Sequence, residues 1–130
     1  MTSASLNSTG GFASLTCSDL AKSLHFYVDG LGFEVVDKNE VEGKLVFAML
    51  KSGSALLGIG QDDFAKGRER VKGVGLRMWY NTKEDVTSVS ARVKYAGIKL
   101  DNEPEKLPWG PMGFALTDPD GFLITIVQDG

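Results

Sequence analysis

Residues 12–33, FASLTCSDLAKSLHFYVDGLGF, join the pattern of a strand to the pattern of a helix. Alternate residues of 12–17 fall on opposite faces, which is typical of a strand. Ser18 or Asp19 then offers an oxygen that can cap a helix. Large apolar side chains recur from Leu20 to Leu31 at spacings of about four and three, which predicts one amphipathic helix. Three more strands are predicted over residues 33–37, 44–50 and 55–59.

The same order of elements then returns. Segments 74–80, 98–100, 114–117 and 122–127 read as strands, residues 86–96 read as a helix, and residues 82–85 resemble a capping box. Such an internal duplication predicts two modules that must pair, because one sheet with one helix cannot close a core. We therefore expect a single α+β domain over residues 1–130. It would contain two βαβββ modules (about 11–61 and 73–128), a solvated charged linker (about 62–72) and curved mixed sheets around a cleft.

Composition narrows the function classes. The chain has 130 residues, 42% of them hydrophobic, which suffices for one core without disulfides. A net charge of -3 argues against a nucleic-acid partner, and no apolar run reaches the roughly 20 residues that cross a bilayer. Cys17 is the only cysteine, so we expect a cytoplasmic protein. A buried inert thiol is favoured there over a nucleophile, since the one histidine, His25, falls in the predicted helix.

Several phrases carry a family resemblance. These are SDL at 18–20, FY at 26–27, LGF at 31–33 and the turn DPDGF at 118–122. At this spacing, over residues 11–128, they resemble the glyoxalase/bleomycin resistance protein/dioxygenase superfamily, also called the vicinal oxygen chelate superfamily. From the residues alone, Asp118 and Asp120 are first of all turn formers.

The resemblance implies four metal-ligand positions, usually His or Glu, on four strands that face the cleft. They correspond to Phe12, Gly58, Gly75 and Thr125. None of these is a plausible ligand, so we expect no metal, no other cofactor and no catalytic residue. Pro108-Trp109-Gly110 adds a similarity to the metal-free bleomycin resistance proteins, which are dimers that sequester a drug. The expectation is a metal-independent protein that binds an aromatic or anionic compound or antibiotic. The alternative is a related lyase, isomerase or dioxygenase-type enzyme.

Strand alternation predicts which side chains line the cleft. The predicted ligand-binding residues are Phe12, Ser14, Gly58, Gly75, Arg77, Trp79, Trp109 and Thr125. For Phe12 and Trp79, filling the core is the favoured alternative. Arg77 would be a buried cation that needs a partner, either Glu42, Glu103 or a bound anion. The expected partners are thus a small molecule and a second copy of the chain, with no membrane and no nucleic acid.

Overall fold

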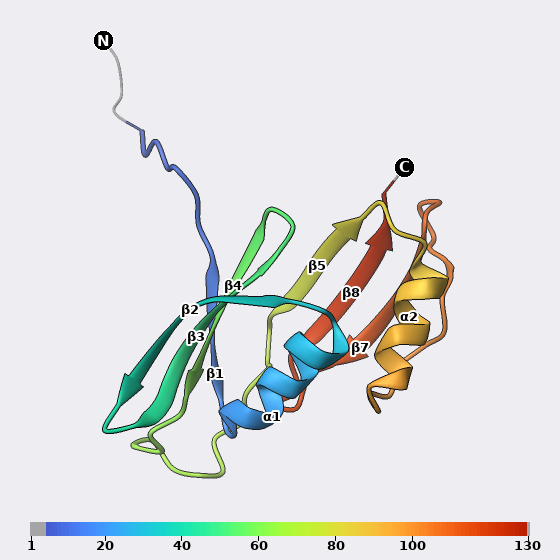
Figure 1. Ribbon diagram of the computed structural model, residues 1–130. Coiled ribbons are helices and arrows are strands. Elements are labelled where there is room, and N and C mark those ends of the chain that lie inside the picture. The colour runs from blue at the N-terminus through green and yellow to red at the C-terminus, as the bar shows by residue number, and fades with distance from the viewer. Residues whose placement is uncertain (1–4, 130) are drawn as a thin grey trace.

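The computed structural model describes residues 5–129, so residues 1–4 and 130 of the predicted domain lie outside it. The first module contains β1 (Ala13–Cys17), α1 (Leu20–Leu24), the π-helical turn η1 (His25–Gly30), β2 (Glu34–Val41), β3 (Lys44–Ser52) and β4 (Ala55–Gln61). The second contains β5 (Arg77–Thr82), α2 (Val86–Tyr95), β6 (Glu105–Lys106), β7 (Met112–Thr117) and β8 (Leu123–Gln128). Figure 1 shows the two modules side by side, each with its own sheet. Within residues 5–129, no helix has the length and apolar character needed to cross a bilayer.

Both sheets are mixed and have the same topology. Their strand orders are β1-β4-β3-β2, called sheet A here, and β5-β8-β7-β6, called sheet B. The edge strand β1 runs parallel to β4, with Ser14 opposite Gly58. In the same way β5 runs parallel to β8, with Trp79 opposite Thr125. The predicted α+β fold of two βαβββ modules is therefore confirmed.

The two helices start with the same hydrogen bonds. Asp19 caps α1 by accepting two backbone N–H groups of its first turn, and Asp85 caps α2 by accepting the N–H of Thr87. The last residue of each module's final strand adds a second contact. Gln61 Oε1 accepts the N–H of Leu20 at 2.9 Å, and Gln128 Oε1 accepts the N–H of Val86 at 3.1 Å. The prediction of a cap at Thr82 was wrong by one turn, because that hydroxyl instead accepts the N–H of Glu84.

Two predicted elements differ from the structure. The single helix predicted up to Leu31 becomes π-helical from His25 on. The strand predicted at 98–100 is absent, and the two-residue strand β6 takes the fourth place in sheet B. The Asn102 side chain explains the loss, because its oxygen accepts the N–H of Ala115 at 3.1 Å. A side-chain amide thus takes the place of a backbone carbonyl beside β7.

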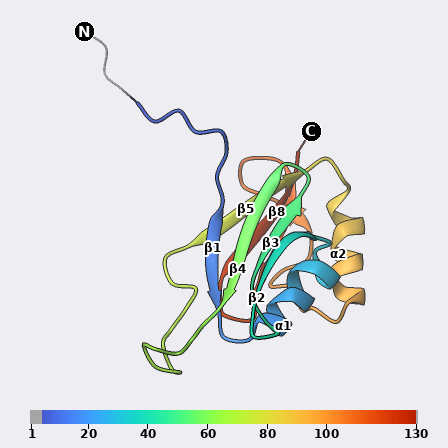
Figure 2. The ribbon, with the colours of Figure 1, turned by 60° about the vertical axis from the view of Figure 1, so that its left-hand side comes forward.

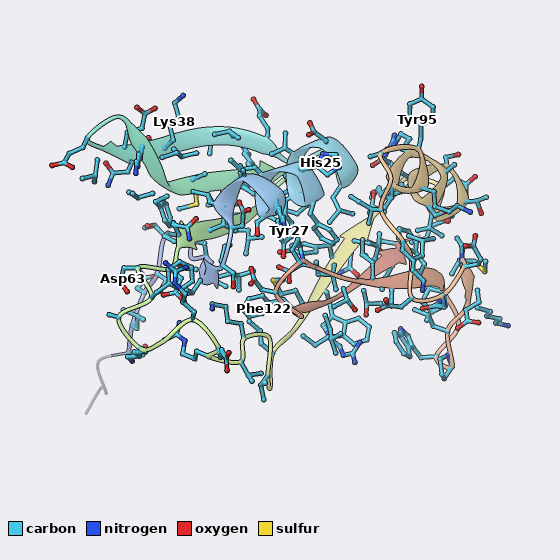
Figure 3. All side chains as sticks on the ribbon, turned by 90° about the horizontal axis from the view of Figure 1, so that it is seen from below. His25, Tyr27, Lys38, Asp63, Tyr95 and Phe122 are labelled. Atoms are coloured by element: carbon cyan, nitrogen blue, oxygen red, sulfur yellow. The ribbon has the colours of Figure 1, made fainter. Side chains whose placement is uncertain are left out.

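The helix-covered faces of the two sheets turn toward each other and share one core. Phe33, just before β2, packs edge-on against Tyr80 of β5, with ring centroids 5.4 Å apart. Tyr27 lies near the middle of the molecule, between the two sheets (Figure 3). Fully buried members of this core from both modules are Tyr27, Leu50, Leu57, Ile59, Val86, Val93, Phe114, Leu116 and Ile124. The opposite face of each sheet therefore points outward, away from the common core.

The linker is closed by an ion pair at its base. Most of residues 62–72 are exposed, as predicted for a solvated loop. The side chains of Asp62 and Lys72 at its two ends are nevertheless buried, with Lys72 Nζ 2.9 Å from Asp62 Oδ2. The pKa of Asp62 is lowered, chiefly by its contact with Lys72. Figure 2 shows the loop projecting below β1 and β4.

Candidate ligand-binding site

The outward face of sheet A holds three of the predicted site residues. Phe12 precedes β1 and is half exposed, Ser14 is exposed on β1, and Gly58 faces the same way from β4. Gly58 does not leave an open space, because Phe47 of β3 lies over it. A Cβ atom at Gly58 would lie 2.8 Å from Phe47 Cζ and 3.3 Å from Phe12 Cε2. Two aromatic rings thus cover the position where the family places its second metal ligand.

The outward face of sheet B holds four more of these residues. Trp79 of β5 and Trp109 of the β6–β7 loop pack together, with centroids 5.6 Å apart and planes tilted by 60°. They are 49% and 60% exposed, so each ring keeps a free surface. Thr125, opposite Trp79 in the register, is buried. These contacts correct the favoured view that Trp79 fills the core.

Arg77 shares this face but is exposed at the start of its strand, where a buried cation was predicted, and Gly75 lies outside the strand. Arg77 begins β5 and is exposed, and no ion pair holds it within residues 5–129. Of its two predicted partners, Glu103 instead pairs with Lys94 at 2.7 Å. Gly75 precedes the strand and has a φ of +77°, so the prediction that β5 starts at residue 74 was wrong.

The register also moves the third ligand position of the family. Phe12 lies two residues before Ser14, and Arg77 lies two residues before Trp79, in strands with equivalent pairing. Arg77 therefore matches Phe12, in place of Gly75. A guanidinium is permanently protonated and cannot donate to a cation. Among the described residues, no three His, Cys, Asp or Glu side chains converge into a metal site. The residues present do not fit the metal of the family.

The two groups of predicted residues do not meet in one chain. Phe12, Ser14 and Gly58 lie in or next to sheet A, while Arg77, Trp79, Trp109 and Thr125 lie in or next to sheet B. Each helix packs on the sheet of its own module, and these covered faces share one core, so the two outward faces look away from it. Within one chain these residues therefore do not form one continuous cleft.

Sequence reasoning missed how the modules are joined. Tyr27 donates its hydroxyl to Asp118 Oδ2 at 2.7 Å, and both residues are buried. The carboxylate of Asp120 accepts the N–H of Ser18, with both oxygens at 3.1 Å. The predicted turn contacts are also present, because Asp118 Oδ1 accepts the N–H groups of Asp120 and Phe122 at 2.9 Å. Burial raises the pKa of Asp118, and the bond from Tyr27 opposes that shift.

A groove lies at the opposite end of this junction and was also missed. It has a volume of about 530 Å³ and runs between the β3–β4 turn, the end of β5 and one side of α2. Its polar walls are Ser52, Ser54, Asn81, Thr82, Lys83, Glu84 and Arg92. Of the eight predicted ligand-binding residues, only Trp79 borders it. The groove is thus separate from most of the predicted site.

Cys17 and His25 have structural contacts. Cys17 is fully buried, and desolvation raises the pKa of its thiol to about 11, in keeping with the expected inert thiol. His25 is exposed on η1, with Nδ1 2.9 Å from Asp29 Oδ2 and Nε2 3.1 Å from the carbonyl oxygen of Ala96. It thereby links η1 to the end of α2.

The chain is similar to several known proteins. A Vibrio cholerae serotype O1 (strain ATCC 39315 / El Tor Inaba N16961) protein named Probable lactoylglutathione lyase is 29% identical over 126 residues, which cover 88% of this chain and 86% of that protein. A superfamily member from Sphaerobacter thermophilus DSM 20745 is 25% identical, with a TM-score of 0.72 and coverage of 95% of this chain and 98% of that one. TioX from Micromonospora sp. ML1 is 18% identical, with a TM-score of 0.75 and coverage of 93% and 98%. This last likeness concerns the fold alone.

The family profile agrees with the duplicated topology. The profile of the Glyoxalase/Bleomycin resistance protein/Dioxygenase superfamily matches residues 7–126, which is nearly the whole chain. Both four-stranded sheets and their order fit this assignment. The chain belongs to the glyoxalase/bleomycin resistance protein/dioxygenase superfamily.

Proposed function

We propose that the protein binds a small aromatic or anionic molecule, such as an antibiotic, without a metal and without chemical conversion, in the cytoplasm. The exposed tryptophan pair carries this proposal. Trp79 and Trp109 offer free ring surfaces on the same side of sheet B as Arg77, a cation with no ion pair within residues 5–129. Aromatic faces favour stacking on planar molecules, and a guanidinium favours carboxylate or phosphate groups.

The side chains at the family's metal positions support the metal-free part of the proposal. Phe12, Gly58, Arg77 and Thr125 supply neither imidazole nor carboxylate. Restoring a carboxylate at position 58 would require Phe47 to move, since even a Cβ there approaches its ring to 2.8 Å. Elemental analysis of tag-free protein should find no stoichiometric Zn, Ni, Fe or Mn. One tightly bound metal per chain would overturn the metal-free proposal.

A homodimer is part of the same proposal. Each chain leaves β1 and β5 as free sheet edges and turns Phe12, Trp79 and Trp109 outward, at 49–60% exposure. Open edges and exposed aromatic surface both favour cover by a partner. Sheet A of one chain facing sheet B of its partner would complete two clefts from the two groups of site residues. Light scattering should give about 28 kDa, twice the 14.0 kDa of one chain. A stable 14.0 kDa species at micromolar concentration would contradict the dimer.

Intrinsic fluorescence offers a direct test of ligand binding. The chain has only two tryptophans, and both belong to the proposed site. We would titrate 1-naphthoate and, as the uncharged control, 1-naphthylmethanol. Arg77→Met should weaken naphthoate binding about 10- to 100-fold, as expected for a charge-assisted contact of roughly 1.5–3 kcal/mol, and should leave the alcohol unaffected. Trp109→Ala should weaken the binding of both probes, and by less than Arg77→Met weakens naphthoate binding, since an aromatic face contributes roughly 0.5–1.5 kcal/mol.

Two results would count against this site. If neither probe changes the tryptophan emission of the wild-type protein, the tryptophan pair does not bind planar aromatic molecules. If Arg77→Met unfolds the chain while the residual folded fraction keeps its affinity, Arg77 has a structural role and the charge is not part of the site.

An enzyme is the second candidate. The observation that favours it is the 29% identity to the protein named Probable lactoylglutathione lyase, over 88% of this chain. Lactoylglutathione lyase activity would be assayed on metal-depleted protein with and without added Zn²⁺ or Ni²⁺. The binding proposal predicts no activity in either state. Metal-dependent turnover above the protein-free control would favour the enzyme.

A further inference from the structure

The junction between the modules has two ends that are built from equivalent elements. At one end, the β7–β8 turn of the second module contacts the segment after β1. There the carboxylate of Asp120 accepts the N–H of Ser18, and Asp118 accepts the hydroxyl of Tyr27. This end is closed by two carboxylates that cross from one module to the other.

At the other end, the β3–β4 turn faces the segment after β5, and the carboxylates are missing. Gly53 and Asp120 are equivalent, since each lies five residues before the matched positions Gly58 and Thr125. A Cβ atom at Gly53 would find no atom within 4 Å, so the position is open.

The segment after β5 also lacks the partner that its counterpart has. Lys83 is the equivalent of Ser18, because each is the first residue after the edge strand of its sheet. The backbone N–H of Ser18 is bonded to Asp120, but that of Lys83 has no hydrogen bond within residues 5–129. The groove of about 530 Å³ lies here.

The chemistry of the groove suits a carboxylate. Lys83 and Arg92 bring two cations, and Glu84 is the single acidic residue that borders the groove. Glu84 and Arg92 pair with each other, with Arg92 Nη2 3.0 Å from Glu84 Oε1, so Lys83 is the cation of the groove that no carboxylate pairs with within residues 5–129. Hydroxyl groups from the β3–β4 turn line the facing wall. The volume lies within the roughly 300–1,000 Å³ typical of small-molecule sites.

We propose that the open end of the junction binds a small organic carboxylate, which takes the place that Asp120 fills at the closed end. One carboxylate group accepts the backbone N–H of Lys83 and pairs with its ammonium group, while the rest of the molecule contacts the β3–β4 turn. Such a ligand bridges the two modules and stabilises their contact. The site is distinct from the proposed tryptophan site, with Trp79 as the one shared wall, and it does not depend on the proposed function.

The test compares two variants at Gly53. Its φ of +56° is the left-handed region, where Asp and Asn are tolerated best among residues with side chains. Gly53→Asp supplies the missing carboxylate from the chain itself, and Gly53→Asn is the matched uncharged control. The probes are succinate and its neutral diamide. Binding is followed by the amide NMR signal of Lys83 and by thermal unfolding.

Wild-type protein should bind succinate, with a shift of the Lys83 amide signal and a rise in Tm. The neutral diamide should cause neither change. Gly53→Asp should weaken the binding of succinate at least tenfold. Without ligand, the Tm of Gly53→Asp should lie above that of Gly53→Asn. Gly53→Asn should stay within about threefold of the wild-type affinity. Lys83→Gln should lower the affinity for succinate tenfold or more. This is the loss of roughly 1.5 kcal/mol expected for one charge-assisted contact.

Several outcomes would overturn the proposal. These are equal binding of succinate and diamide, equal loss in the Asp and Asn variants, or unchanged affinity in Lys83→Gln. If wild-type protein does not respond to succinate and Gly53→Asp instead dissociates a dimer, a second copy of the chain covers the groove and the proposal is wrong. If both Gly53 variants fail to fold, the comparison of Lys83→Gln with wild type tests the proposal, by the same NMR and thermal-unfolding measurements of succinate binding.

Discussion

Removing one hydroxyl group from Tyr27 tests how the modules hold together. Tyr27 Oη lies 2.7 Å from Asp118 Oδ2, and it is the only donor to that oxygen within residues 5–129. Tyr27→Phe keeps the ring packing against Phe26 and Phe33 but leaves Asp118 Oδ2 buried without a partner. A hydrogen bond to a charged group contributes roughly 1.5–3 kcal/mol. At about 3–5 °C per kcal/mol for a domain of this size, we expect a fall in Tm of roughly 5–15 °C at pH 7.

The loss of stability in Tyr27→Phe should depend on pH. Burial raises the pKa of Asp118 above its ordinary value, and the bond from Tyr27 lowers it. A carboxyl group with a raised folded-state pKa adds stability below its unfolded pKa, and this contribution is lost as the pH rises through the folded pKa. Tyr27→Phe removes the opposing bond, so the pKa of Asp118 rises further and more stability is lost over that window. The difference in unfolding free energy between wild type and variant should therefore be smaller near pH 3.5 than at pH 7.

Tyr80→Phe is the matched control. The hydroxyl of Tyr80 has only the sulfur of Met78, at 3.6 Å, as its partner within residues 5–129. Urea unfolding of both variants at the two pH values should show the larger loss for Tyr27→Phe at pH 7. If the two variants lose the same free energy of unfolding, the bond between Tyr27 and Asp118 does not stabilise the junction of the modules.

Two further changes test other contacts. Gly58→Ala should lower the free energy of unfolding by about 1 kcal/mol more than Gly60→Ala does. The added methyl meets the Phe47 ring at 2.8 Å in the first case and at 3.6 Å in the second. Equal unfolding free energies would contradict the close packing over Gly58. Lys72→Met removes the cation that lowers the pKa of Asp62. A carboxyl group with a lowered folded-state pKa adds stability above its unfolded pKa of about 4, and this stability is lost as the pH falls. The free energy of unfolding of Lys72→Met should therefore change less between pH 5 and 2 than that of the wild-type protein. A variant with the wild-type acid dependence would rule out Lys72 as the cause.

The sequence alone determined the order of elements and the duplication. Alternation over residues 12–17 and the apolar stripe from Leu20 are local patterns, and each follows from one element burying one face. The capping residue Asp19 is equally local, because its oxygen bonds amides two and three residues ahead. Residue type alone shows that Phe12, Gly58 and Thr125 carry no imidazole or carboxylate, whereas the third position, Arg77 in place of Gly75, came only from the strand register.

Only the tertiary structure decided how these elements form sites. Tyr27 and Asp118 are 91 residues apart, and no local period reports their contact. Asn102 replaces a predicted strand because its amide meets Ala115, which again depends on long-range placement. Periodicity assigns a residue to one face of a sheet, but the packing of the helices decides where that face points. For this reason Phe12, Ser14 and Gly58 lie apart from Arg77, Trp79 and Thr125 in one chain, although alternation placed them all on one cleft.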